Sequence, residues 1–161
     1  MFNLKAEFYL KIIFLFSFIA LISAFFIEYV LGHQPCNLCL IERIPYGLSI
    51  MITMAIFLIR KNQKFLVMLL ILTFVFSFAI SFYHFGIEQG FFQESSVCGV
   101  KSSTEIVTKE DLLKQLSEKT ISCKDVTFRI FGLSLTSINI VISLLFIITL
   151  LKIFKKYEKN K

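Results

Sequence analysis

The sequence predicts an all-α membrane protein: a bundle of four transmembrane helices with a long polar loop on one side. Of the 161 residues, 57% are hydrophobic, and the mean hydropathy is +0.79. Four runs are long and apolar enough to cross a bilayer, which takes about 20 residues. A soluble domain of this size could not bury so much apolar surface, so lipid is the expected solvent for most of the chain.

The predicted spans cover residues 12–31, 41–59, 65–83 and 130–151. They form one membrane domain that includes the whole chain, residues 1–161. The first run is longer than the apolar region of a signal peptide, and no clear A-x-A site follows it, so we interpret it as a retained anchor. Residues 85–129 contain no run of spanning length and form the predicted outer loop, in which residues 108–118 have the spacing of a short amphipathic helix.

The basic residues predict the orientation of these spans. The two termini and the short loop after the second span together carry ten Lys or Arg against two Glu, whereas the loop at 85–129 carries six Lys or Arg against seven Asp or Glu. Basic residues near span ends favour the cytoplasmic side. Both termini are therefore expected in the cytoplasm, and all four cysteines are expected on the opposite, oxidising side.

The stretch "PCNLCLIER" joins a C-x-x-C pair, Cys36 and Cys39, to Arg43. Pro35 favours a helix start here, and the partial positive charge of a helix N-terminus stabilises a thiolate. In a regular helix Arg43 lies on the same face as Cys39, where a guanidinium could stabilise a thiolate or an anionic cofactor. The alternatives are a structural disulfide and an arginine that reaches the membrane interface.

A second pair, Cys98 and Cys123, lies in the polar loop. It could be a static cross-link that stabilises the loop, or an exposed disulfide that exchanges with an outside thiol. A zinc site usually needs two close cysteine pairs, and this pair is separated by 24 residues, so no metal site is predicted.

Three polar residues near the span ends have further possible roles. His84, in "YHFGIEQGFF", could donate a hydrogen bond to a quinone carbonyl, or it could be an interfacial histidine beside an aromatic belt. Glu88 follows His84 by four residues and is placed to pair with it. Asn139, in the fourth run, is interpreted as a hydrogen-bonding group between helices.

At these residues the chain resembles the DsbB family of bacterial membrane disulfide-bond-formation proteins. The resemblance covers nearly the whole chain and includes "PCNLCLIER", "YHFGIEQGFF" before Cys98, and "CKDVTFRIFGLSL" from Cys123. It implies a protein-disulfide oxidoreductase of the bacterial inner membrane with its cysteines in the periplasm. Such a protein belongs to the DsbA–DsbB–quinone route that keeps the periplasm oxidising.

The resemblance also implies a role for each site residue. A reduced DsbA-type partner of thioredoxin fold would attack the loop disulfide, with Cys98 forming the mixed disulfide. Cys123 would then pass electrons to the inner pair through Cys36. Cys39 would face the cofactor, ubiquinone or menaquinone, with Arg43 and His84 as further binding residues. The expected partners are therefore the DsbA-type oxidase, membrane lipid and quinone, and no nucleic acid.

Two other functions are compatible with parts of the sequence. A protein of the vitamin K epoxide reductase type also uses four cysteines in a small helical bundle, but its C-x-x-C lies near the last core span. A structural tetraspan protein with two inert loop disulfides needs no chemistry from its cysteines, but it gives no reason for Arg43 four residues after Cys39.

Overall fold

The computed structural model describes residues 4–59, 62–93, 98, 122–124, 129–130 and 132–159. Its four helices are α1 (Leu4–Tyr29), α2 (Asn37–Leu58), α3 (Gln63–Glu88) and α5 (Leu135–Lys159). A short antiparallel hairpin, β1 (Arg129–Ile130) paired with β2 (Leu133–Ser134), precedes α5. The predicted amphipathic helix at 108–118 lies outside the described residues.

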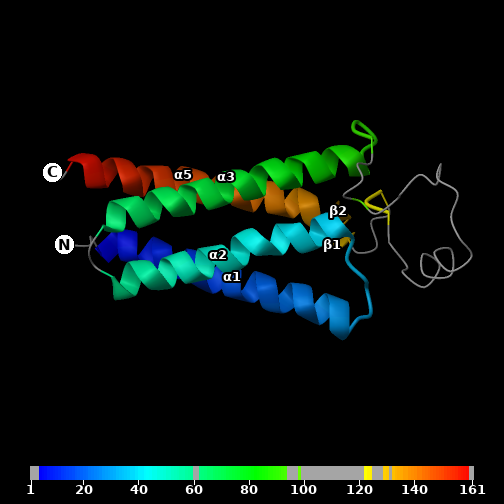
Figure 1. Cartoon of the computed structure of the whole chain (residues 1–161), viewed down its shortest axis with the longest axis horizontal. Helices are drawn as coiled ribbons and strands as arrows, with labels where there is room; N and C mark the ends of the chain where they lie inside the picture. Colours follow the sequence, from blue (N-terminus) through cyan, green and yellow to red (C-terminus); the bar gives the residue numbers. More distant parts are fainter. Residues whose placement is uncertain are drawn as a thin grey trace, which may run out of the picture.

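The helices run alternately up and down as one elongated bundle (Figure 1). The two ends of the chain and the connection between α2 and α3 lie at one end of the bundle, and the α1–α2 connection and the hairpin lie at the other. We call this second end the loop end. Each of the four helices contains a stretch long and apolar enough to cross a membrane, which confirms the predicted all-α membrane bundle.

The helices differ from the predicted spans at their ends. α2 begins at Asn37, four residues before the predicted span, and α3 continues to Glu88, five residues beyond it. Apolar runs reveal only the lipid-facing part of a helix, so polar turns at its ends are missed. The last helix starts later than predicted, at Leu135, because the hairpin occupies the first residues of the predicted span. The hairpin turns at Gly132, which has a φ of +82°.

Small polar residues hold the helices together inside the bundle. Ser49 of α2 donates a hydrogen bond to Ser17 of α1 across 2.7 Å, and Ser143 of α5 donates to Ser77 of α3 across 3.2 Å. Small side chains allow close approach between helices, and in lipid their hydroxyls have no water as an alternative partner. A cluster of buried apolar residues fills the rest of the interior towards the other end: Leu10, Ile13, Ile56, Val67, Leu70, Phe74 and Leu150.

The end of α3 explains part of the motif "YHFGIEQGFF". The amides of Phe91 and Phe92 both donate to the carbonyl of Gly86, which folds the chain back over the helix. The Phe92 ring stacks on Tyr83 with 5.7 Å between ring centroids, and a Cβ at residue 86 would overlap that ring. Gly86 is therefore required by the close approach of Phe92.

Gly86→Ala should destabilise the protein by about 1–3 kcal/mol, because the added methyl overpacks the contact with Phe92. Gly47→Ala is the matched control: it also lies within a helix, but its added methyl meets nothing within 4 Å. That change should stabilise the helix by roughly 0.4–1 kcal/mol. Thermal unfolding of both variants in detergent measures the difference, and equal effects of the two changes would contradict the packing of Phe92 on Gly86.

Candidate functional site

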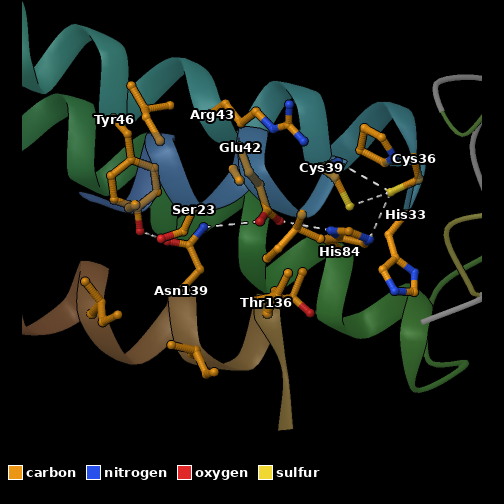
Figure 2. Close-up of a pocket in the computed structure, with 18 of the residues that line it drawn as sticks. Ser23, His33, Cys36, Cys39, Glu42, Arg43, Tyr46, His84, Thr136 and Asn139 are labelled. Atoms are coloured by element: carbon orange, nitrogen blue, oxygen red, sulfur yellow. Dashed lines mark hydrogen bonds and ion pairs between the residues drawn. The ribbon is translucent and has the colours of Figure 1, made fainter. Parts of the chain in front are cut away.

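A cavity of about 270 Å³ opens at the loop end between α1, α2, α3 and α5. Apolar side chains form one part of its wall, among them Phe16, Ala20, Leu21, Ile138 and Ile142. A polar row forms the other part, and Figure 2 shows contacts running from the two cysteines through His84 and Glu42 to Asn139 and Tyr46. The cavity therefore combines an apolar interior with a few polar groups, as small-molecule sites usually do.

The C-x-x-C pair forms the first turn of α2. Cys36 is the N-cap residue, and its sulfur accepts a hydrogen bond from the backbone amide of Cys39 at 3.4 Å. The two Sγ atoms lie 2.9 Å apart as thiols, with Cys36 buried and Cys39 half-buried. The N-cap position directs amide donors at one sulfur only, which makes the two thiols chemically different.

Cys36, the residue before the membrane-spanning part of α2, is the acidic thiol of the pair. A hydrogen bond from the Cys39 side chain and the neighbouring His84 lower the pKa of Cys36 to about 4, although burial opposes the change. An ordinary cysteine has a pKa of about 8.5. At neutral pH Cys36 is therefore a thiolate, the form that acts as nucleophile and as leaving group in disulfide exchange.

His84 of α3 lies between Cys36 and a buried carboxylate. Its Nε2 is 3.6 Å from the Cys36 sulfur, and its Nδ1 is 3.0 Å from Glu42 Oε1. A carboxylate can only accept, so Nδ1 donates to Glu42, and Nε2 is left to exchange a proton with the sulfur. A thiol beside an imidazole that is oriented by an acid is the arrangement found in activated cysteine nucleophiles.

Asn139 of α5 holds the other oxygen of Glu42. Its Nδ2 donates to Glu42 Oε2 at 3.2 Å and to Ser81 Oγ at 2.7 Å, and its Oδ1 accepts a hydrogen bond from the Tyr46 hydroxyl. This confirms the interpretation of Asn139 as a hydrogen-bonding group between helices. Contacts with α3 and α5 thus fix the orientation of Glu42, which belongs to α2. Glu42 in turn orients His84.

Arg43 occupies a different part of the wall. Its guanidinium forms an ion pair with Glu28 of α1 and lies 5.3 Å from the centroid of the Phe25 ring. Both charged side chains are mostly buried, and their pairing offsets the high cost of a charge within a membrane helix. Arg43 and Cys39 both line the cavity, as the helical spacing predicted.

The loop cysteines lie against the inner pair. Cys98 and Cys123 are joined by a disulfide with 5.7 Å between their Cα atoms, and both are buried. They form one cluster with Cys36, Leu38 and Ile87, and Cys123 also lines the cavity. All four cysteines therefore meet at the loop end, although the two pairs are far apart in the sequence.

Comparison with known proteins identifies the family. The model of the family "Disulfide bond formation protein DsbB" matches residues 6–153. The chain belongs to the DsbB family. It is also 31% identical over 147 residues to "Uncharacterized protein RP370" of Rickettsia prowazekii (strain Madrid E), an alignment that covers 90% of this chain and 86% of that protein. Membership in the DsbB family assigns the chain to the machinery of disulfide formation and agrees with the multi-pass membrane bundle.

The thiols and His84 could also hold a metal ion. The ligand atoms of Cys36, Cys39 and His84 all lie within 4.8 Å of one another. Two sulfurs and one imidazole suit a thiophilic ion such as zinc. The disulfide form of the inner pair could not offer these ligands, so a DsbB-family protein could bind such an ion only when reduced. The absence of a metal site stays a prediction.

Two site residues were missed by the sequence analysis. Glu42 appeared only as a letter within "PCNLCLIER", although it is buried and contacts His84. Tyr46 was not noticed, because an aromatic residue within an apolar run has no distinctive signal. Glu42 could have been recognised as an acid within a span, since buried ionisable residues in membranes are usually functional.

The lowered pKa of Cys36 predicts its reactivity as a function of pH. In the reduced protein the thiolate persists wherever the pH exceeds the pKa of about 4, so iodoacetamide should modify Cys36 at a nearly constant rate from pH 8 to about pH 5.5. In Cys39→Ala the main cause of the shift is lost, and the rate should already decline near pH 8. Peptide mass spectrometry measures the modification, and identical profiles in the two proteins would contradict the role of Cys39.

Proposed function

We propose that this protein is a quinone-dependent thiol oxidase that reoxidises a DsbA-type partner of thioredoxin fold in the periplasm. The observation that supports this function best is the position of the loop disulfide, which packs against Cys36 beside a mostly apolar cavity. A structural protein with inert cross-links would need neither an acidic thiol nor a cavity next to it. The charge bias of the loops supports the inner membrane as the location, with the cysteines on the periplasmic side.

Electrons would pass through two disulfide exchanges. The partner's dithiol reduces Cys98–Cys123 through a mixed disulfide at Cys98, leaving two loop thiols and an oxidised partner. Cys123 then attacks Cys36 of the oxidised inner pair and releases Cys39. Cys98 attacks Cys123 in turn, which restores the loop disulfide and expels Cys36. The low pKa of Cys36 supports this direction, because a more acidic thiol leaves faster.

The cavity residues fit a quinone, which can accept two electrons and two protons when bound. The apolar wall of Phe16, Leu21 and Ile142 suits a lipid-soluble ring. Arg43 and His84 would be the donors to its oxygens, and Cys39 would be the thiol that faces it. His84 holds a proton next to Cys36, and Glu42 keeps the imidazole in the correct orientation.

The route predicts a clear separation between two cysteine variants. With a reduced thioredoxin-fold donor and ubiquinone, the wild-type protein should reduce quinone, and Cys39→Ser should abolish the reaction. Cys98→Ser should also abolish reduction driven by the protein donor. It should retain most of the reduction driven by a small dithiol, which can reach the inner pair without the loop.

Loss of the quinone absorbance measures both reactions. Ubiquinone and menaquinone are tested separately, because either could serve. Quinone reduction by Cys39→Ser at the wild-type rate would eliminate the proposed route. Failure of the wild-type protein with both quinones and several donors would favour the structural tetraspan protein.

Arg43→Ala should raise the KM for quinone about 10-fold, because a charged hydrogen bond contributes roughly 1.5–3 kcal/mol. The single change also leaves the Glu28 carboxylate without its partner, which could disturb the fold. The double variant Glu28→Gln, Arg43→Ala removes that charge. A KM that stays high in the double variant reports the lost guanidinium, and a KM that returns to the wild-type value would limit Arg43 to a structural role.

A further inference from the structure

Glu88 has an unusual environment at the end of α3. Its side chain is 6% exposed, and its Oε1 accepts a hydrogen bond from Thr136 Oγ1 at 2.5 Å. Its Oε2 is the one buried side-chain oxygen or nitrogen in the described part of the chain that has no hydrogen-bond partner. An ionised carboxylate with a bare, buried oxygen is costly, so the group needs a physical explanation.

Glu88 lies beside the imidazole that contacts both Cys36 and Glu42. His84 lies between two carboxyl groups, with Nδ1 3.0 Å from Glu42 and Nε2 3.9 Å from Glu88. Both oxygens of Glu42 have hydrogen-bond partners, whereas only one oxygen of Glu88 does. Arg43 forms its ion pair with Glu28 and not with Glu88. Besides Glu88, the titratable groups on the same cavity are His33, Cys36, Cys39, Glu42, Arg43, Tyr46 and His84.

A chain of hydroxyls continues from Glu88 to the start of α5. Thr136 Oγ1 lies 2.7 Å from Ser134 Oγ, which lies 2.9 Å from Ser137 Oγ. Thr136 and Ser134 are buried, whereas Ser137 is half-buried at the loop end of the bundle. Each hydroxyl can both donate and accept a hydrogen bond. A proton can therefore move along the row when each hydroxyl accepts a proton from one neighbour and gives its own to the next. Its one gap is the 3.9 Å between Glu88 Oε1 and His84 Nε2.

We propose that Glu88 carries an exchangeable proton and, with Thr136 and Ser134, forms the path by which protons pass between His84 and the loop end of the bundle. The inference rests on the proposed thiol oxidation by quinone. It gives Glu88 and Thr136 a role in proton movement that is separate from the binding roles of Arg43 and Cys39.

The reaction consumes one proton more than the two sulfurs supply, and Glu88 lies where it can replace the proton that His84 gives up. When the inner pair is oxidised, the Cys36–Cys39 bond forms, two electrons go to a quinone, and the quinone takes up two protons. Cys36 enters as a thiolate and Cys39 as a thiol, so the sulfurs supply only one of these protons. Glu88 supplies the second through His84. When the loop thiols reduce the inner pair again, they release two protons; Cys39 takes one, and Glu88 recovers the other.

Two isosteric substitutions test this path, each with a matched control. Glu88→Gln keeps an oxygen for Thr136 but removes the acid, and Glu7→Gln changes an exposed carboxylate near the other end of the bundle. Thr136→Val interrupts the hydroxyl row, and Thr149→Val makes the same change further along α5, where the hydroxyl only donates to a carbonyl of its own helix.

The first measurement needs no quinone. An infrared spectrum of the protein should contain the carbonyl stretch of a protonated carboxylic acid, and this band should disappear in Glu88→Gln but persist in Glu7→Gln. The second measurement is quinone reduction driven by a small dithiol, which should decline roughly 100-fold in Glu88→Gln, the scale of a lost proton donor. Thr136→Val should lose activity in the same direction, and both controls should match the wild-type protein.

The outcomes separate this inference from the proposed function. Quinone reduction by Glu88→Gln at the wild-type rate, or an acid band that survives in that variant, would overturn the proton path and leave the thiol oxidase intact. If the wild-type protein reduced no quinone, the proposed function would be overturned together with the path. Exchange between the protein donor and the loop disulfide should be unchanged in Glu88→Gln, and its loss would indicate a folding defect and contradict a role limited to proton movement.

Discussion

The hydrogen bond between His84 and Glu42 is the contact on which the site depends. It joins α3 to α2 inside the bundle and determines which nitrogen of the imidazole faces Cys36. Asn139 adds α5 to the same contact by holding the second oxygen of Glu42. Removal of one partner from a buried, charged pair costs about 3–5 kcal/mol, because the other partner is left uncompensated. The same contact therefore supports both the packing of three helices and the chemistry of the thiol.

The membrane accounts for where the polar residues lie. Lipid offers no hydrogen bonds, so a polar side chain on the outer face of the bundle would lose the partners that water gives it. Several buried polar side chains of the helices instead meet one another in pairs, such as Ser17 with Ser49 and Ser77 with Ser143. Large apolar residues such as Phe18, Met51 and Phe76 face outward. The bundle is thus polar at selected interior positions and apolar where it meets lipid.

The inner thiols differ because α2 begins between them. Cys36 precedes the helix and receives the amide of Cys39, whereas Cys39 lies within the first turn. An oxidase that passes electrons from a loop to a cavity needs this asymmetry, since one sulfur must face the incoming thiol and the other the acceptor. The cluster of Cys36 with Cys98 and Cys123 on one side, and the cavity on the other, is consistent with that division.

The sequence by itself determined the properties that depend on the length of apolar runs, the grouping of charges and the spacing of residues along a helix. Apolar runs of sufficient length predicted four membrane helices, and the grouping of basic residues predicted the placement of the cysteines at one end. The spacing of Cys39 and Arg43 predicted that both lie on one face of the helix, and both line the cavity. Each of these inferences uses the length of a run, the grouping of charges or the spacing of residues along the chain, so no contact between distant segments was needed.

The tertiary structure alone decided which distant groups meet. His84 is 48 residues from Cys36 and 42 from Glu42, and Asn139 is 97 from Glu42. These contacts depend on the rotation and depth of three packed helices, which no periodic pattern specifies. The helix ends were also set by tertiary features, such as Phe92 folding back over Gly86. The thiols could therefore be predicted from the sequence, and so could the contact of Glu88 with His84, which is one helical turn away. The contacts of Glu42 with His84 and Asn139 could not, because they join three helices that are far apart in the sequence.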